Sequence, residues 1–217
     1  MARVWSIVVA GGSGRRFGRM KQFSALGGRP VLEWAVAACR PCSAGVVLVV
    51  PAAPDGHDLH GADSVVTGGA TRSESVRCGL AAVPADAEVI VVHDAARPLA
   101  SPALFDAVLE AVDGGGADGA VPGLPPSDTI KAVDESGRVT STLDRATLVA
   151  VQTPQAFRAA VLRRAHQHSP ASATDDAMLV EALGGSVQVV PGEPGNLKIT
   201  GPGDLDAAER LLAAREG

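Results

Sequence analysis

The chain has 217 residues, of which 46% are hydrophobic and 20% charged, a composition typical of one globular domain with a full core. Its net charge of -5 and its 3% aromatic content argue against nucleic-acid binding, because phosphate backbones recruit basic surfaces and unpaired bases stack on aromatic rings. No apolar run is long enough for a transmembrane helix, and Met1–Ala10 lacks the features of a signal peptide. We therefore expect one cytoplasmic domain spanning residues 1–217, with no nucleic-acid or membrane partner.

Short β-branched runs alternate with helical patterns through the first part of the chain, which predicts a Rossmann-like, mostly parallel α/β sheet flanked by helices. Strands are expected, in chain order, at Val4–Ala10, Gly45–Val50, Ser64–Thr67, Glu88–Val92 and Gly119–Val121. Helices are expected at Pro30–Cys39, Arg72–Ala82 and Ser101–Val112, the last with a serine N-cap followed by proline. Ligands of such sheets bind at the carboxyl ends of the strands, so the loops after the first, third and fourth strands are expected to face one crevice.

The pattern changes after residue 121. Thr129–Val133 and Arg138–Thr142 alternate on either side of the turn Asp134–Gly137, which predicts an antiparallel hairpin. We interpret residues 126–147 as a protruding β-arm that reaches for a partner subunit. The remaining elements are expected at Leu148–Val151 and Val187–Pro191 as strands, and at Arg158–His168, Asp175–Leu183 and Gly203–Arg215 as helices.

Three cysteines fit a reducing compartment. Cys39 and Cys42 have redox-motif spacing, but no thioredoxin-like strand pattern leads into them, and Cys78 is the only other cysteine. Four zinc ligands are hard to assemble from these residues, even with His57 or His60. We interpret the cysteines as incidental thiols.

The loop after the first strand is rich in glycine and arginine. It is not a dinucleotide fingerprint, because Phe17 stands where the third glycine belongs, and it lacks the Gly-Lys-Ser/Thr ending of a P-loop. Its exposed N–H groups and cations are what a polyphosphate requires, and they are contributed by Gly11, Gly12, Gly14, Arg15, Arg16 and Lys21. The alternative interpretation is a solvated basic turn.

A second charged segment, His93–Pro98, directly follows an apolar strand. Asp94 and Arg97 lie three residues apart there and can hold ribose hydroxyls, a phosphate or a hydrated Mg²⁺. A structural ion pair is the alternative. The Asp-x-Asp motif of metal-dependent glycosyltransferases is absent from this segment, and the one at Asp204–Asp206 falls at a helix start, where it serves the positive end of the helix dipole.

Together these segments resemble the 2-C-methyl-D-erythritol 4-phosphate cytidylyltransferase family of the non-mevalonate isoprenoid pathway. Each motif alone is weak, but their order is specific. The matching segments are the glycine-arginine loop, Lys21-Gln22, Gly68-Gly69 with Arg72 and Ser75-Val76, His93–Pro98, Asp128–Lys131, Thr153–Gln155, Thr174–Ala177, Asn196–Thr200 and Asp204-Leu205. The chain departs from the family pattern at Gly11, Met20 and Ala70, where alanine, proline and an acidic residue are usual.

The resemblance implies a nucleotidyltransferase-type fold and a homodimeric enzyme that uses Mg²⁺. This enzyme transfers the CMP moiety of CTP to a small sugar-alcohol phosphate, 2-C-methyl-D-erythritol 4-phosphate, and releases pyrophosphate. It also implies that Arg16 and Lys21 stabilise the transition state at the α-phosphate, and that Arg145 and Lys198 hold the sugar phosphate. The expected substrate-binding residues are Asp94, Arg97, Thr129 and Thr153 on the sugar-phosphate side, Ala10, Gly11, Gly69 and Ser75 around cytosine, and Gly12, Gly14 and Arg72. The resemblance assigns no direct metal ligand.

Such a reaction needs no protein nucleophile, because a phosphate monoester has a second pKa of about 6 and is largely dianionic near neutral pH. We therefore expect His93 to be structural rather than a general base. The alternatives are a ribitol 5-phosphate cytidylyltransferase, a guanylyl- or uridylyltransferase, and a non-catalytic nucleotide-binding regulatory subunit. A non-catalytic subunit is disfavoured because a site without activity has no physical reason to keep five charged groups. These groups are Arg16, Lys21, Asp94, Arg145 and Lys198.

Overall fold

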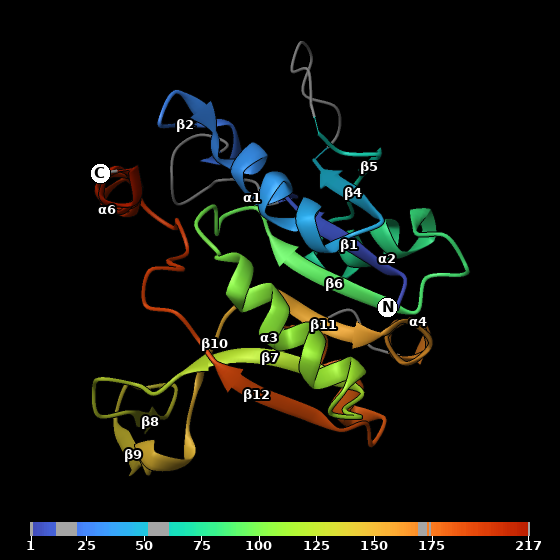
Figure 1. Cartoon of the computed structure of the whole chain (residues 1–217). Coiled ribbons are helices and arrows are strands. Elements are labelled where there is room, and N and C mark those ends of the chain that lie inside the picture. Colours follow the sequence, from blue (N-terminus) through green and yellow to red (C-terminus); the bar gives the residue numbers. More distant parts are fainter. Residues whose placement is uncertain (1, 12–20, 52–60, 169–172, 174, 217) are drawn as a thin grey trace.

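The structure is a computed structural model that describes residues 2–11, 21–51, 61–168, 173 and 175–216. Its centre is an eight-stranded mixed sheet with helices on both faces (Figure 1). The strand order is β10-β7-β11-β6-β1-β4-β5, and β12 also pairs with β7. The strands are β1 (Val4–Val9), β4 (Gly45–Val50), β5 (Ser64–Thr67), β6 (Val89–Asp94), β7 (Gly119–Leu124), β10 (Ala150–Val151), β11 (Gln155–Arg158) and β12 (Val187–Pro191).

The middle strands are apolar on both sides because helices cover both faces of the sheet. Every residue of β4 is buried, and its side chains alternate between two cores: Val46 and Leu48 face one, and Val47 and Val49 face the other. The helices are α1 (Val31–Cys39) and α3 (Pro102–Asp113) on the first core, α2 (Arg72–Ala82), α4 (Ala159–His168) and α5 (Asp176–Ala182) on the second, and the last helix α6 (Pro202–Glu216). No helix in the described ranges is both long enough and apolar enough to cross a membrane.

A third, smaller core lies where α6 meets α1. It joins Leu26 and Val31 to Ile199 and Leu212, which are far apart in the sequence. The short antiparallel pair β2 (Ala25–Leu26) and β3 (Arg29–Pro30) carries the first of these residues. This core therefore ties the segment that follows Lys21 to the segment that follows Lys198.

The expected hairpin is present as β8 (Lys131–Val133) and β9 (Val139–Thr142), which form a two-stranded sheet of their own. Figure 1 shows this arm projecting beyond the edge of the main sheet near β7 and β10. Asp134 closes its turn by accepting hydrogen bonds from the N–H groups of Ser136 and Arg138, and Gly137 takes a positive φ of 81°. The arm is therefore built by local turn chemistry rather than by packing on the main core.

The predicted fold class is confirmed, and the helix at Arg72–Ala82 and the strands at Gly45–Val50, Ser64–Thr67 and Val187–Pro191 have the predicted bounds. The serine cap before α3 is also confirmed, since Ser101 Oγ accepts a hydrogen bond from the Leu104 N–H at 3.2 Å. The sequence reading missed β2, β3 and β11. It placed Arg158 at the start of a helix, whereas Arg158 ends β11 and the helix begins one residue later.

Cys39, Cys42 and Cys78 are free thiols. Cys39 is wholly buried, and this burial raises the pKa of its thiol far above the usual value. Cys42 donates a hydrogen bond to the Cys39 carbonyl at 3.3 Å. Both observations agree with structural rather than reactive thiols.

Candidate functional site

A polar pocket lies beside the carboxyl end of β6, where the segment between β10 and β11 and the segment before α6 converge. Its volume of about 130 Å³ is small beside ordinary ligand pockets, so the described residues enclose room for a phosphate-sized group. It is lined by Arg72, Asp94, Arg97, Val151, Gln152, Thr153, Gln155, Asp175 and Lys198. Three of these side chains are cationic and two are acidic, so the lining has a small positive excess.

Asp94 is the central carboxylate of the pocket. Its Oδ2 accepts a hydrogen bond from Lys198 Nζ at 2.7 Å, and its Oδ1 accepts one from Arg72 Nε at 3.2 Å. Burial alone disfavours the charged form of Asp94, but Arg72 and Lys198 outweigh it and hold the pKa of this carboxyl well below its usual range. Asp94 is therefore an anion that fixes two cations at the pocket wall.

A hydrogen-bonded chain behind Asp94 holds its backbone in place. The Asp94 N–H donates to Thr153 Oγ1 at 3.0 Å, and Thr153 Oγ1 lies 3.1 Å from His93 Nδ1. His93 Nε2 lies 3.0 Å from the Arg97 carbonyl and donates to it. His93 has no exposed surface, and burial lowers its pKa to about 4, so it is a neutral structural residue as expected.

Arg97 contributes the third cation. Its Nη1 donates to the Asn196 carbonyl at 2.7 Å, while its Nε is buried and has no hydrogen-bond partner among the described residues. Burial lowers the pKa of Arg97 from its usual value. A buried donor without an acceptor is costly, and this one belongs to a cation that lines the pocket.

Behind the pocket, Arg72 reaches a second carboxylate. Its Nη1 donates to Asp176 Oδ2 at 2.7 Å, and His166 Nε2 lies 2.9 Å from Asp176 Oδ1. The side chains of Asp176 and His166 are only 1% and 2% exposed. Burial raises the pKa of Asp176, but the Arg72 guanidinium and His166 outweigh this effect and keep it below its usual value. A line of paired groups thus runs from the interior to Lys198.

The loops after β1 and β5 meet over Ser75, as the expected shared crevice requires. A Cβ added at Gly11 or at Gly68 would lie 2.9 Å or 2.6 Å from Ser75 Oγ, so both loops approach α2 closely. The Ser75 hydroxyl itself donates to the Thr71 carbonyl at 2.9 Å. Any ligand contact of this region is therefore expected from loop backbone rather than from the serine hydroxyl.

The start of α2 fixes the same crevice. Thr71 and Glu74 form a capping box, in which each side chain accepts a hydrogen bond from the other residue's backbone N–H. A Cβ at Gly69 would lie 2.3 Å from Glu74 Cβ, so this position has no room for a side chain. Ala10 is buried, and its carbonyl accepts from Gln22 Nε2 at 2.9 Å, which ties β1 to the segment at Lys21.

The remaining predicted site residues fall into two groups. Arg16, Gly12 and Gly14 lie outside the described residues, as does the side chain of Lys21, whose backbone begins a short 3₁₀ helix, η1 (Lys21–Phe23). Thr129 and Arg145 are exposed at the arm and are not among the residues that line the pocket. Arg145 Nη1 donates to the Ser127 carbonyl at 2.9 Å, so it braces the base of the arm.

Sequence reasoning assigned no role to four residues that line the pocket or support its side chains from behind. Asn196 and Gln152 are buried; Asn196 Nδ2 donates to the Thr153 carbonyl at 2.9 Å, and Gln152 Nε2 donates to the Glu193 carbonyl at 2.9 Å. The other two are Asp176 and His166. Asn196 and Asp176 fall inside segments that carried the family resemblance, whereas nothing in the sequence around His166 signals its contact with Asp176.

The described residues offer no cage of protein ligands for a metal ion. They contain no group of three or more His, Cys, Asp or Glu side chains that could ligate one ion. Both oxygens of Asp94, the residue expected to approach a hydrated Mg²⁺, already accept from cations.

The comparisons with known proteins agree with the motifs. A family model described as 2-C-methyl-D-erythritol 4-phosphate cytidylyltransferase matches residues 4–214. The 2-C-methyl-D-erythritol 4-phosphate cytidylyltransferase of Frankia casuarinae is 48% identical over 219 residues, which cover 97% of this chain and 82% of that protein. The bifunctional enzyme IspD/IspF of Anaeromyxobacter dehalogenans is 47% identical over 226 residues, covering 98% of this chain and 58% of that protein, so this chain spans little more than half of that relative.

A solved structure gives the same result. The 2-C-methyl-D-erythritol 4-phosphate cytidylyltransferase of Thermus thermophilus superposes with a TM-score of 0.81 at 38% identity, covering 95% of this chain and 98% of that one.

Proposed function

Because the chain belongs to the 2-C-methyl-D-erythritol 4-phosphate cytidylyltransferase family, we propose that it transfers the CMP moiety of CTP to 2-C-methyl-D-erythritol 4-phosphate. The products are 4-diphosphocytidyl-2-C-methyl-D-erythritol and pyrophosphate. The observation that carries the proposal is the cationic end of the pocket, where Arg72, Arg97 and Lys198 converge and Arg97 Nε lacks an acceptor among the described residues. A phosphate monoester supplies the anionic oxygens that such a site needs.

In the proposed reaction, an oxygen of the sugar phosphate attacks the α-phosphorus of CTP. A new P–O bond forms there, and the bond from the α-phosphorus to the bridging oxygen breaks, so that pyrophosphate leaves with that oxygen. Lys198 and Arg97 hold the attacking phosphate, and Arg16 and Lys21 are proposed to neutralise charge at the α-phosphorus. The protein's work is positioning and electrostatic stabilisation, as in other phosphoryl and nucleotidyl transfers.

Magnesium enters this proposal as part of the substrate. Mg²⁺ usually keeps several waters and is held through substrate phosphates with one or two carboxylates, so a Mg–CTP complex needs no cage of protein ligands. The cytoplasmic location expected from the sequence stays a prediction.

A homodimer is part of the same proposal. Val133 and Val139 pair across the arm and are 57% and 55% exposed, so the arm presents an apolar pair to solvent. Arg145 and Thr129 lie on the arm, away from the pocket lining of their own chain. An arm that crosses to a partner subunit would bring these residues to the partner's pocket, where the family resemblance expects them.

The test is a pyrophosphate-release assay with CTP and Mg²⁺, offering 2-C-methyl-D-erythritol 4-phosphate and ribitol 5-phosphate in separate reactions. We expect release with the former at least about 100-fold faster than with the latter, since a site built to pair specific hydroxyls penalises a mismatched substrate strongly. Pyrophosphate release with ribitol 5-phosphate alone would change the substrate assignment to that compound. No release with either phosphate would favour a non-catalytic nucleotide-binding subunit. Replacing CTP with GTP and UTP tests the base preference in the same assay.

A further inference from the structure

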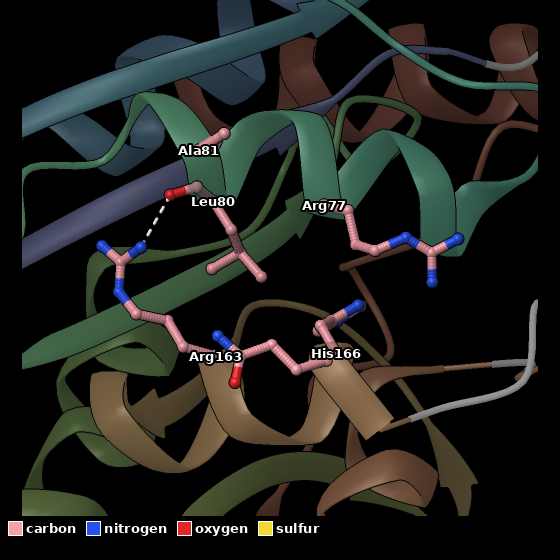
Figure 2. A pocket seen from close by; sticks show the side chains of 6 residues that line it. Arg77, Leu80, Ala81, Arg163 and His166 are labelled. Atoms are coloured by element: carbon pink, nitrogen blue, oxygen red, sulfur yellow. Dashed lines mark hydrogen bonds between the residues drawn. The ribbon is translucent and has the colours of Figure 1, made fainter.

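The line of groups behind the pocket ends at a histidine that touches no expected substrate. His166 lies on α4, and its ring forms part of the wall of a second pocket, of about 260 Å³, between α4 and α2 (Figure 2). Figure 2 shows α4 held beneath α2 by Arg163, whose Nη1 donates to the Leu80 carbonyl at 2.8 Å. His166 therefore sits between this helix–helix contact and the carboxylate of Asp176.

Only one of the two ring nitrogens of His166 has a hydrogen-bond partner among the described residues. Nε2 donates to Asp176 Oδ1 at 2.9 Å, because Asp176 is ionised and can only accept, whereas Nδ1 is buried and has no hydrogen-bond partner among the described residues. A buried ring nitrogen without a hydrogen-bond partner is destabilising, and a leucine at this position would avoid that cost. Within the described structure, the hydrogen bond to Asp176 is the polar interaction that His166 makes in return for this cost.

Asp176 in turn restricts Arg72. Its carboxylate is 1% exposed, with Oδ1 facing His166 and Oδ2 facing Arg72 Nη1, so rotation of the carboxylate would break both contacts. Arg72 is held at the other end by Asp94 through Nε. Two carboxylates on two of its nitrogens fix the plane of the guanidinium and leave Nη2, with both its hydrogens, to meet an anion in the pocket.

We propose that His166 and Asp176 are positioning residues for the proposed reaction: they fix the Arg72 guanidinium so that it binds the phosphate of the acceptor substrate. The inference rests on the proposed function for the identity of that phosphate. The geometry that it predicts at Arg72 does not depend on which substrate is used.

Four variants separate positioning from packing. His166→Leu keeps the volume and removes the donor, while His166→Gln places an amide N–H near the position of Nε2. Asp176→Asn keeps the shape and removes the charge that holds Arg72. Leu162→Ala is the matched control, because Leu162 is fully buried on the same helix but belongs to the apolar core and not to the polar line.

The kinetic expectation is a change in KM. His166→Leu and Asp176→Asn should raise KM for 2-C-methyl-D-erythritol 4-phosphate about tenfold, the size of one weakened charge-assisted hydrogen bond, with kcat changed less than about threefold. His166→Gln should stay within about threefold of the wild-type KM. Leu162→Ala should lose stability and keep the wild-type KM. An unchanged KM in His166→Leu, or an equal rise in Leu162→Ala, would overturn the positioning role.

A second readout needs no turnover. The Arg72 Nε–H resonance, assigned by its loss in Arg72→Lys, should be sharp and slow to exchange in the wild type and in His166→Gln, and broadened in His166→Leu. A sharp signal in His166→Leu would contradict the proposal even if the chain proved inactive. Absence of pyrophosphate release by the wild type with a sharp Arg72 signal would instead count against the proposed reaction alone.

Discussion

Lys198 and Asp94 form the most exposed ion pair of the pocket, since the lysine side chain is 43% exposed and the carboxylate 11%. The carboxylate end is largely buried and the lysine end is open to solvent, so the pair positions an ammonium group at the pocket surface. In the proposed reaction, this arrangement would present a fixed cation to a phosphate that arrives from solvent.

Substituting Lys198 tests that role. We expect Lys198→Met to lower kcat/KM about 100- to 1000-fold, by analogy with the loss of one donor to a developing oxyanion, while the melting temperature changes by only a few degrees. Steady-state kinetics with both substrates varied, alongside thermal unfolding, checks this. Arg210→Met, at an exposed position of α6, is the control for loss of a surface cation. Activity within about threefold of the wild type would remove Lys198 from the site.

His93 predicts how stability depends on pH. Burial lowers its pKa to about 4 in the folded protein, against about 6.5 in the unfolded chain. Between these pH values His93 is therefore protonated in the unfolded chain and neutral in the folded protein. The free energy of unfolding should therefore fall as pH drops from about 6.5 to about 4, by roughly 3 kcal/mol from this group alone.

Urea unfolding at pH 7.0, 5.5 and 4.5 measures this dependence. A neutral variant, His93→Gln, should be less stable at pH 7 but should show a flatter decline over the same range. Parallel curves for the wild type and the variant would mean that another group dominates. Asp94 and Asp176 have lowered pKa values, so their contributions are lost only below about pH 4, as they become protonated.

At the scale of elements, the arm stands out because β8 and β9 form a separate sheet whose valines are exposed to solvent. Val139→Asp should convert a dimer to a monomer and lower turnover, because a charge on the exposed valine pair would be buried without a partner in an arm-mediated interface. Sedimentation velocity measured beside activity tests the link. Val65→Asp is the matched control, since Val65 is 45% exposed on β5, at the other edge of the sheet. A dimer that survives Val139→Asp would place the interface elsewhere.

The elements that sequence predicts well are those specified by their own residues. The β-branched run Gly45–Val50 can be little else than a buried strand, and the turn at Asp134–Gly137 carries its own hydrogen bonds. By contrast, Gln155–Arg158 becomes strand β11 only because it fills the gap between β6 and β7 in antiparallel register. No local propensity of four such residues indicates that position.

The site residues also divide into those that the sequence indicates and those that only the tertiary structure brings together. Glycines and charged residues at strand ends indicated the crevice, and motif order indicated Asp94, Arg97 and Lys198. His166 could not be found from sequence, because a lone histidine on an amphipathic helix looks like many core histidines. The positioning role proposed for His166 depends on α4 and α5 packing together so that Asp176 meets it, and this packing is a property of the tertiary structure.

At the scale of the whole molecule, the third core decides how the two halves of the site are joined. Leu212 of α6 packs on the turn after β2, where a Cβ at Gly27 would lie 2.6 Å from Leu212 Cδ2, and the Gly27 N–H donates to Glu209 Oε1 at 3.0 Å. Gly27 also takes a positive φ of 56°, so glycine is required there both for conformation and for space. Helix α6 thus holds together the segments that carry Lys21 and Lys198.

Leu212→Ala should loosen the connection between the segments that carry Lys21 and Lys198. We expect a loss of about 2–3 kcal/mol in the free energy of unfolding from the cavity, and a larger loss of turnover than of CTP binding, because the two phosphate-binding halves would no longer be held in register. Chemical denaturation and calorimetry with CTP measure these quantities, and Arg210→Ala on the exposed side of α6 is the control. Full activity in a destabilised Leu212→Ala would show that the third core serves stability alone.

The position of that core in the sequence has a consequence for biosynthesis. Strands β1, β4, β5 and β6 can pair as soon as the chain up to Asp94 has left the ribosome, and the crevice at their carboxyl ends would then already exist. The partners that complete the pocket, Lys198 and the α6 side chains that anchor it, emerge more than a hundred residues later. A nascent chain would therefore expose an incomplete pocket in which Asp94 lacks one of its two cations, and the charge balance of the proposed site would be reached only when α6 docks.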